Sequence, residues 1–148
     1  MKKISLIILT YNSEKDIYDC LDSVYLHNDI GDALEIIVVD NNSEHYARMH
    51  DKLSTLYPQV NIISNITNGG YGQGNNIGIR VASAPIVSIM NPDVRLVMPI
   101  FQRVLSTFED QNIVMCGGKQ YKNATTPTIS FWCDYHRNAL LQSIGISY

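Results

Sequence analysis

Cysteine is scarce in this sequence, and the spacing of the few cysteines excludes two common kinds of site. Cys20, Cys116 and Cys133 are the only three in 148 residues, and they lie far apart. An odd number of widely spaced cysteines indicates neither a disulfide framework nor a Cys-x-x-Cys zinc site. A reducing compartment therefore fits the sequence best.

Long apolar runs and clustered positive charge are also missing. No apolar run approaches the ~20 residues needed to cross a bilayer, so we expect any membrane contact to be peripheral. The 11 Lys and Arg are scattered, and with 14 Asp and Glu they give a formal net charge of -3. This composition argues against nucleic acid as a partner, and a phosphorylated ligand would need a cation or backbone amides.

Two familiar nucleotide-binding signatures are absent. The chain contains no G-x-G-x-x-G, and the glycine-rich segment 69–74 is not followed by the Lys-Ser/Thr of a Walker A loop. Dinucleotide-binding and P-loop interpretations therefore lose their main support.

The sequence does contain a regular alternation of apolar runs and amphipathic segments. With 45% hydrophobic residues, 148 residues are enough for one domain with a real core. The alternation is typical of a parallel sheet covered by helices on both faces, so we expect an α/β fold with a mostly parallel central sheet. Strands are expected at 3–9, 35–39, 60–64, 86–90 and 113–116, and helices at 13–27, 43–57, 75–82 and 99–109. After Gly118 the pattern changes, and we expect short strands at 121–123 and 128–132 and a helix at 135–143.

Two of the apolar runs end in an acidic residue. Asp40 follows 35–39, and Asp93 follows 86–90 behind Asn91 and Pro92. Ligands of open α/β sheets bind outside the carboxyl ends of the strands, so both acids are expected in a shared crevice. One carboxylate, waters and substrate phosphates are a normal ligand set for Mg²⁺ or Mn²⁺, which makes Asp93 a candidate metal ligand. Taken alone, Asn-Pro-Asp is also compatible with an ordinary turn.

The turns after the first two strands have both a functional and a structural interpretation. In the segment 10–13, Tyr11 could stack on a nucleobase, or the segment could simply cap the next helix, with Ser13 and Asp16 as a capping pair. In the segment 40–43, Asp40 could accept the imide N–H of uracil or thymine, or the segment could be a polar turn in which Ser43 caps a helix.

The glycine-rich segment 69–76 also has two interpretations. Four glycines that lead into a helix N-terminus supply amide donors suited to phosphate, and Asn75 and Asn76 would add side-chain donors. Alternatively, the segment is only a flexible turn.

Taken in order, these segments resemble the donor half of an inverting family 2 glycosyltransferase of the GT-A fold. Four landmarks carry the resemblance, at 8–12, 35–43, 68–78 and 89–93, and it covers about residues 3–121. It implies a nucleotide-sugar-binding core at 1–121 and the incomplete start of an acceptor-side region at 122–148. The Asn-Pro-Asp variant is similar to a subgroup labelled rhamnosyltransferases, which implies a UDP- or dTDP-sugar donor.

The resemblance also implies roles for individual residues. Thr10 and Asp40 match residues that contact the base, the glycine- and asparagine-rich segment lies near the sugar diphosphate, and Asp93 matches a ligand of Mg²⁺ or Mn²⁺. The implied nucleotide-sugar-binding residues are Thr10, Tyr11, Asn12, Asp40, Asn42, Gly70, Asn75, Asn76 and Asn91. Asp110 and Asp134 match no general-base motif of the family, so no catalytic residue is assigned.

The implied activity is sugar transfer with inversion to a saccharide or lipid-linked acceptor, in polysaccharide biosynthesis on the cytoplasmic side of a membrane. Family members normally continue into an acceptor-binding half that we expect to be missing here, so we expect little transfer by this chain alone. One alternative is a glycosyltransferase-like module that binds nucleotide or a partner without turnover. Another is a sugar-nucleotide nucleotidyltransferase, which would carry a Gly-rich, Arg-containing loop where this chain has Thr10, Tyr11 and Asn12.

Overall fold

The computed structural model describes residues 1–118, 120–121 and 127–128. The chain divides into two compact units, Met1–Pro99 and Ile100–Tyr148, which are described separately. The helix expected at 135–143 lies outside the described residues, as does most of the strand expected at 128–132. The functional boundary proposed at residue 121 stays a prediction.

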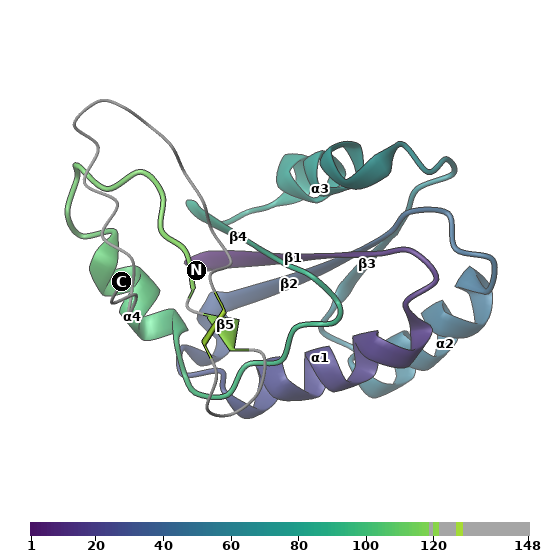
Figure 1. The fold of residues 1–148 in the computed structure, drawn as a ribbon, viewed down its shortest axis with the longest axis horizontal. Helices are drawn as coiled ribbons and strands as arrows, with labels where there is room; N and C mark the ends of the chain where they lie inside the picture. The colour runs from purple at the N-terminus through teal and green to yellow at the C-terminus, as the bar shows by residue number, and fades with distance from the viewer. Residues whose placement is uncertain (119, 122–126, 129–148) are drawn as a thin grey trace. The chain divides into compact units, whose positions relative to one another are not determined.

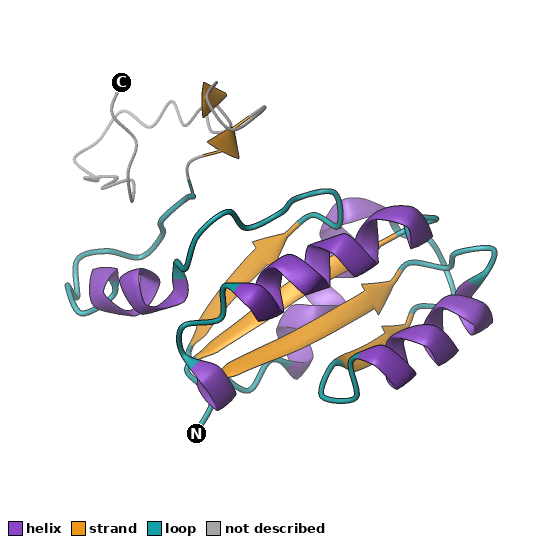
Figure 2. Ribbon diagram, turned by 90° about the horizontal axis from the view of Figure 1, so that it is seen from below, coloured by secondary structure: helices purple, strands orange, loops and turns teal. Residues whose placement is uncertain are grey.

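The first unit is a four-stranded parallel sheet with helices on both faces. Its strands are arranged in the order β3-β2-β1-β4, and every neighbouring pair is parallel. Helix α3 covers one face, and α1 and α2 cover the other (Figure 1, Figure 2). The predicted α/β architecture is confirmed. The elements are β1 (Ile4–Thr10), α1 (Glu14–Leu26), the short 3₁₀ helix η1 (Gly31–Ala33), β2 (Leu34–Asp40), α2 (Tyr46–Leu56), β3 (Asn61–Ser64), α3 (Gly70–Val81) and β4 (Ile86–Met90).

The second unit contains α4 (Phe101–Thr107) and an antiparallel pair of short strands, β5 (Gln120–Tyr121) and β6 (Pro127–Thr128). The strand expected at 113–116 is wrong, because this segment has no regular structure. Asp110 makes a local turn before it by accepting the backbone N–H of Asn112 at 2.9 Å and that of Ile113 at 3.0 Å. Apolar residues alone do not make a strand, and within the described part of the chain this segment has no partner strand.

The central strands form the core because they are covered on both sides. All seven residues of β1 are buried, and six of the seven residues of β2 are buried. Continuous burial of this kind explains why both strands read as nearly continuous apolar runs, interrupted only by Ser5 and Glu35, rather than as alternating ones.

Helix α3 begins at Gly70, earlier than the predicted start at Asn75, because two of its glycines allow very close packing on β1. A Cβ atom at Gly78 would lie 2.6 Å from Cγ2 of Ile7, and one at Gly74 would overlap Leu9. Glycine is a poor helix former, but here tertiary packing outweighs that intrinsic preference. Most of the segment predicted as a glycine-rich turn is therefore the first part of a helix.

The predicted side-chain caps of α1 and α2 are wrong. Ser13 lies at the N-cap of α1, but its hydroxyl donates to the carbonyl of Tyr11 at 3.1 Å and makes no cap. The N-cap of α2 is His45 rather than Ser43, whose hydroxyl donates to Asp40 instead. In both turns the serine hydroxyl donates to a nearby oxygen and caps no helix N–H group.

The packing of α3 on β1 gives a stability prediction. Gly78→Ala should destabilise the fold by ~1–3 kcal/mol, because Ile7 is fully buried and its branched side chain cannot move away. Gly72 lies on the same helix, and a Cβ atom added there would have nothing within 4 Å, so Gly72→Ala should stabilise by about 0.5–1 kcal/mol. Urea denaturation of both variants measures the difference, and equal effects would contradict the packing argument.

Glu35 connects β2 to β1 and to the turn before β4. Its carboxylate accepts the backbone N–H of Ser83 at 2.9 Å, the Ser83 hydroxyl at 3.0 Å and the Ser5 hydroxyl. Burial raises the pKa of Glu35, but these hydrogen bonds together outweigh burial and hold the pKa below its ordinary value of 4.5.

The lowered pKa makes stability depend on pH in a defined direction. The contribution of Glu35 should be fully present above its unfolded-state pKa and should be lost as the pH falls through its lower folded-state pKa. Glu35→Gln should reduce stability at pH 7 by ~1–3 kcal/mol and flatten the acid limb of the stability curve. Denaturant titrations from pH 7 to pH 3 test this, with Glu44→Gln at an exposed position as the control; an unchanged acid limb would contradict it.

In the part of the chain that the structure describes, no helix is both long enough and apolar enough to span a membrane.

Candidate functional site

The carboxyl ends of the parallel strands border a groove of about 470 Å³ in the first unit. It extends from Asn41, which follows β2, to Asp93, which follows β4. The first turn of α3 and the turn after β1 form the remaining walls. The lining residues are Leu9, Tyr11, Ser13, Asp16, Asn41, Asn68, Gly70, Tyr71, Asn91, Pro92 and Asp93.

Only some of the residues proposed from the sequence line this groove. Tyr11, Gly70, Asn91 and Asp93 do so. The other proposed residues are not among the lining residues, namely Thr10, Asn12, Asp40, Asn42, Asn75 and Asn76.

Five polar lining residues were not proposed as site residues from the sequence. Ser13, Asn41, Asn68 and Tyr71 belong to the same motifs as proposed residues, so their place in the motif was the available signal. Asp16 lies in the first turn of α1, which begins at the same edge of the sheet, and only its helical position could have indicated it.

Asp40 and Thr10 are fully buried beneath the edge of the groove. The Asp40 carboxylate accepts the Thr10 hydroxyl at 3.2 Å, the backbone N–H of Ser43 at 2.9 Å and the Ser43 hydroxyl at 2.5 Å. The Ser43 hydroxyl oxygen in turn accepts the backbone N–H of Asn12 at 2.8 Å. Asp40 thus joins the turns that follow β1 and β2. For Asp40 to contact a base directly, some of these hydrogen bonds would have to break.

Asn12 and Asn42 have a backbone role in these turns. Both adopt left-handed conformations, with φ values of 51° and 69°. Asparagine tolerates this region better than most residues other than glycine. The Asn12 side chain also accepts the backbone N–H of Glu44 at 3.0 Å, which ties the two turns together a second time.

Three asparagines hold the start of α3 against the end of β2. The buried Asn41 donates to Asn68 Oδ1 at 2.7 Å and accepts from Asn65 Nδ2 at 2.8 Å. Asn68 Oδ1 also accepts the backbone N–H of Gly70 at 3.0 Å. The backbone N–H of Gly70, one of the donors that we expected to bind phosphate, therefore already donates to Asn68.

Arg95 fixes the turn that carries Asp93 against α1. Its guanidinium donates to the carbonyls of Pro92 at 2.9 Å and Val94 at 3.0 Å. It also lies 3.4 Å from Asp19 and 3.8 Å from Asp16. These contacts keep Asp93 exposed at the groove while the backbone around it is held in place.

Cys20 lies beneath the same turn and is chemically inert there. Its thiol is fully buried and lies 3.7 Å from the carbonyl of Asn91. Burial raises the pKa of Cys20 to about 12. The charge of Arg95 lowers this pKa and that of Asp93 raises it, both by smaller amounts. The thiol therefore stays protonated at neutral pH and packs against the turn rather than reacting.

The oxygen donors at the groove fit Mg²⁺ or Mn²⁺ only when a ligand contributes as well. Asp93 and Asp16 both line the groove, and carboxylate oxygens suit these hard cations. The described residues contain no group of three or more His, Cys, Asp or Glu side chains that could hold a metal by themselves. One or two carboxylates completed by ligand phosphates and water are, however, a normal set for these ions.

The sequence pattern that defines Glycosyl transferase family 2 matches residues 5–140. The chain belongs to this family. A relative in Bacillus subtilis, the putative glycosyltransferase EpsH, is 28% identical over 122 residues, which are 76% of this chain and 33% of that protein. The low-salt glycan biosynthesis hexosyltransferase Agl10 of Haloferax volcanii is 33% identical over 100 residues, 63% of this chain and 28% of that protein. This family 2 chain thus spans about a third of the length of the curated relatives it matches.

Solved structures confirm the GT-A type of fold. The mannosyltransferase PcManGT of Pyrobaculum calidifontis, in complex with GDP-Man and Mn²⁺, matches with a TM-score of 0.73 and 21% identity, over 80% of this chain and 36% of that one. S. aureus TarS 1-349, in complex with UDP-GlcNAc, matches with a TM-score of 0.66 and 23% identity, over 85% and 37% of the two chains.

The asparagine contacts give a prediction for this family 2 site. Asn41→Ala removes hydrogen bonds to Asn68 and from Asn65, and it should destabilise the fold by ~1–3 kcal/mol. Asn76→Ala, at an exposed position of α3, should leave stability unchanged or slightly higher, because alanine is the better helix former. Thermal and urea unfolding measure both, and a neutral Asn41→Ala would show that the asparagine contacts do not hold the site.

Proposed function

We propose that this chain is the donor-binding part of a glycosyltransferase that uses a UDP- or dTDP-sugar together with Mg²⁺ or Mn²⁺. The observation that carries the proposal is the single groove that joins Tyr11 and Asn41 to Asp93. A nucleoside diphosphate needs an aromatic or polar surface for its base and a cation for its phosphates. Tyr11 and Asn41 would supply the surface, and the Asp93 carboxylate would hold the cation. Family membership supplies the general class of reaction.

Individual residues would divide this work. Tyr11, whose side chain is half exposed, would stack on the base, and Asn41 lines the same groove. Thr10 and Asp40 would support the base-binding edge through their shared hydrogen bond, and Asp40 would meet the base directly only after a rearrangement. At the other end Asp93 would hold the cation, with Asp16 close to the same space.

The proposed reaction is a single displacement at the anomeric carbon with inversion. A base removes the proton of an acceptor hydroxyl as that oxygen attacks, and the nucleoside diphosphate leaves. When bound, the cation would stabilise the negative charge that develops on the leaving diphosphate. We assign the general base to no residue of this chain, and we expect little transfer unless another polypeptide or segment completes the acceptor side.

The choice of donor and acceptor is part of the proposal. TarS structures contain UDP or UDP-GlcNAc and the PcManGT structure contains GDP-Man, so proteins of this fold accept different bases. The Asn-Pro-Asp turn favours a UDP- or dTDP-sugar of the rhamnosyl type. A saccharide or lipid-linked acceptor in polysaccharide assembly at the cytoplasmic face of a membrane is consistent with the glycan biosynthesis named for Agl10.

Titration calorimetry with UDP, dTDP and GDP, each with Mn²⁺ and with EDTA, tests the donor site. We expect UDP or dTDP to bind, and to bind at least tenfold more tightly with Mn²⁺. Asp93→Ala should abolish the gain from Mn²⁺ without unfolding the protein, because Asp93 is exposed and lies in a turn held by Arg95.

The matched control is Asp51→Ala, an exposed carboxylate on α2 that does not line the groove. It should bind nucleotide as the unaltered protein does. No binding of any nucleotide in either condition would overturn the donor-site proposal. Binding that is unaffected by Mn²⁺ and by Asp93→Ala would instead favour a module that binds nucleotide without turnover.

A further inference from the structure

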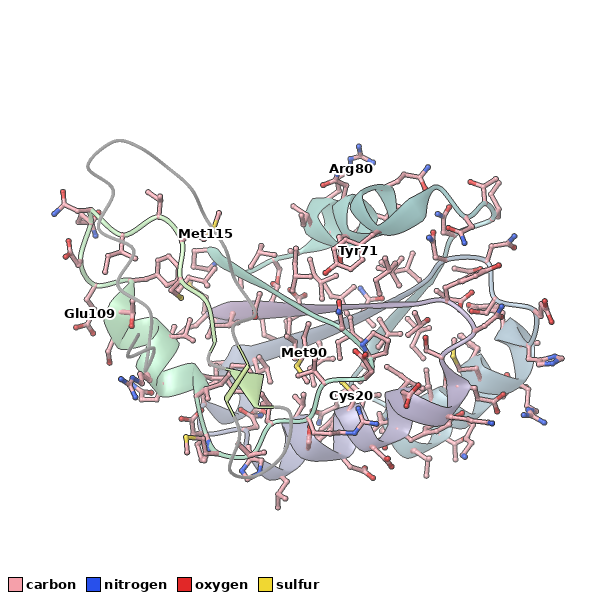
Figure 3. All side chains as sticks on the ribbon, in the orientation of Figure 1. Cys20, Tyr71, Arg80, Met90, Glu109 and Met115 are labelled. Carbon is pink, nitrogen blue, oxygen red and sulfur yellow. The ribbon has the colours of Figure 1, made fainter. Side chains whose placement is uncertain are left out.

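Tyr71 connects the first turn of α3 to the Asn-Pro-Asp turn, although the two are twenty residues apart. It lies on the side of α3 that faces the sheet (Figure 3) and lines the groove. Its hydroxyl donates to Oδ1 of Asn91 at 3.1 Å. Tyr71 is thus a contact between the glycine-rich helix and the turn that carries Asp93.

The backbone of Tyr71 is itself held by a buried side chain. Asn75, which is 3% exposed, donates from Nδ2 to the carbonyl of Tyr71 at 2.9 Å. This hydrogen bond holds the first turn of α3 to the following turn, on which Asn75 is buried. It accounts for the nitrogen of the Asn75 amide, whereas Oδ1 is buried and has no hydrogen-bond partner among the described residues.

The hydrogen bond from Tyr71 determines which end of the Asn91 amide meets the groove. An asparagine side chain has one oxygen that accepts and one nitrogen that donates. Because Oδ1 accepts from Tyr71, Nδ2 is left as the free end, and it makes no hydrogen bond to any residue in the part of the chain that the structure describes. Asn91 is exposed and lines the groove, so a donor rather than an acceptor is available there.

We propose that Tyr71 is a positioning residue that turns Asn91 so that its amide N–H donates to a phosphate oxygen of the bound nucleotide. This inference rests on the donor-site function proposed above and deepens it. Asn91 is then a hydrogen-bond donor to the ligand and not a ligand of the cation, which leaves Asp93 as the carboxylate of this turn that holds the metal. The amide is also neutral, so it adds no negative charge beside the diphosphate.

The test compares UDP affinity with Mn²⁺ and with EDTA for Tyr71→Phe, Asn91→Ala and the double variant. Phenylalanine keeps the ring and removes only the hydroxyl. Each single variant should lose roughly 3- to 10-fold in UDP affinity in both conditions, the range of one hydrogen bond. The ratio of the two affinities should stay as in the unaltered protein. The double variant should be no weaker than Asn91→Ala, because Tyr71 acts only through Asn91.

Asn91→Asp separates the two possible roles of this side chain. If Asn91 donates to phosphate, an aspartate should weaken UDP binding in EDTA more than alanine does, because it places a negative charge against the diphosphate. If Asn91 Oδ1 instead coordinates the cation, Asn91→Asp should leave binding in EDTA unchanged and increase the gain from Mn²⁺, and that result would overturn the inference.

A second readout reports the amide directly. In ¹⁵N-labelled protein the Asn91 side-chain NH₂ signals, identified by their loss in Asn91→Ala, should shift when UDP is added in EDTA. In Tyr71→Phe this shift should be smaller. Unchanged signals, or a Tyr71→Phe affinity equal to that of the control Tyr46→Phe on α2, would overturn the inference while leaving nucleotide binding intact. Failure of the unaltered protein to bind any nucleotide would overturn the donor-site function together with it.

Discussion

The close packing of α3 on β1 is the constraint on which the rest of the site depends. Because Gly74 and Gly78 carry no Cβ, the helix backbone lies directly on Leu9 and Ile7. This contact determines where the first turn of α3 meets the edge of the sheet. It brings Tyr71 to Asn91 on one side and Gly70 to Asn68 and Asn41 on the other. A bulkier residue at either glycine would move both walls of the groove at once.

The groove is built mainly from neutral groups, with charge confined to one end. Amides and hydroxyls connect the end of β1 to that of β2 and the ends of β2 and β3 to the start of α3, and the one acid among them, Asp40, is buried and occupied by hydrogen bonds. Asp93 and Asp16 lie at the other end, beside Arg95. This separation is suited to a ligand that is neutral at one end and anionic at the other, with a cation between its phosphates and the protein.

Most of the fold could be predicted from the sequence, whereas the contacts within the site could not. The nearly continuous apolar runs indicated β1 and β2 because these central parallel strands are buried on both faces, whereas the edge strands β3 and β4 are only partly buried. The start of α3 was misplaced because its glycines are explained only by packing against β1. Thr10 and Asp40 were correctly placed at strand ends, but sequence position does not reveal that their side chains bond to each other and to Ser43. The Asn41, Asn65 and Asn68 contacts join residues far apart along the chain, so no local pattern indicates them.

The way Arg95 holds the Asn-Pro-Asp turn has a consequence for the thermodynamics of recognition. The guanidinium, the Ser23 hydroxyl that accepts from the backbone of Leu96, and the Cys20 thiol together fix this turn to α1. The loss of backbone freedom there occurs when the protein folds, so little would remain to be lost on binding of the proposed nucleotide. Ligand association at this edge of the molecule should therefore resemble the filling of a rigid receptor more than the ordering of a loop.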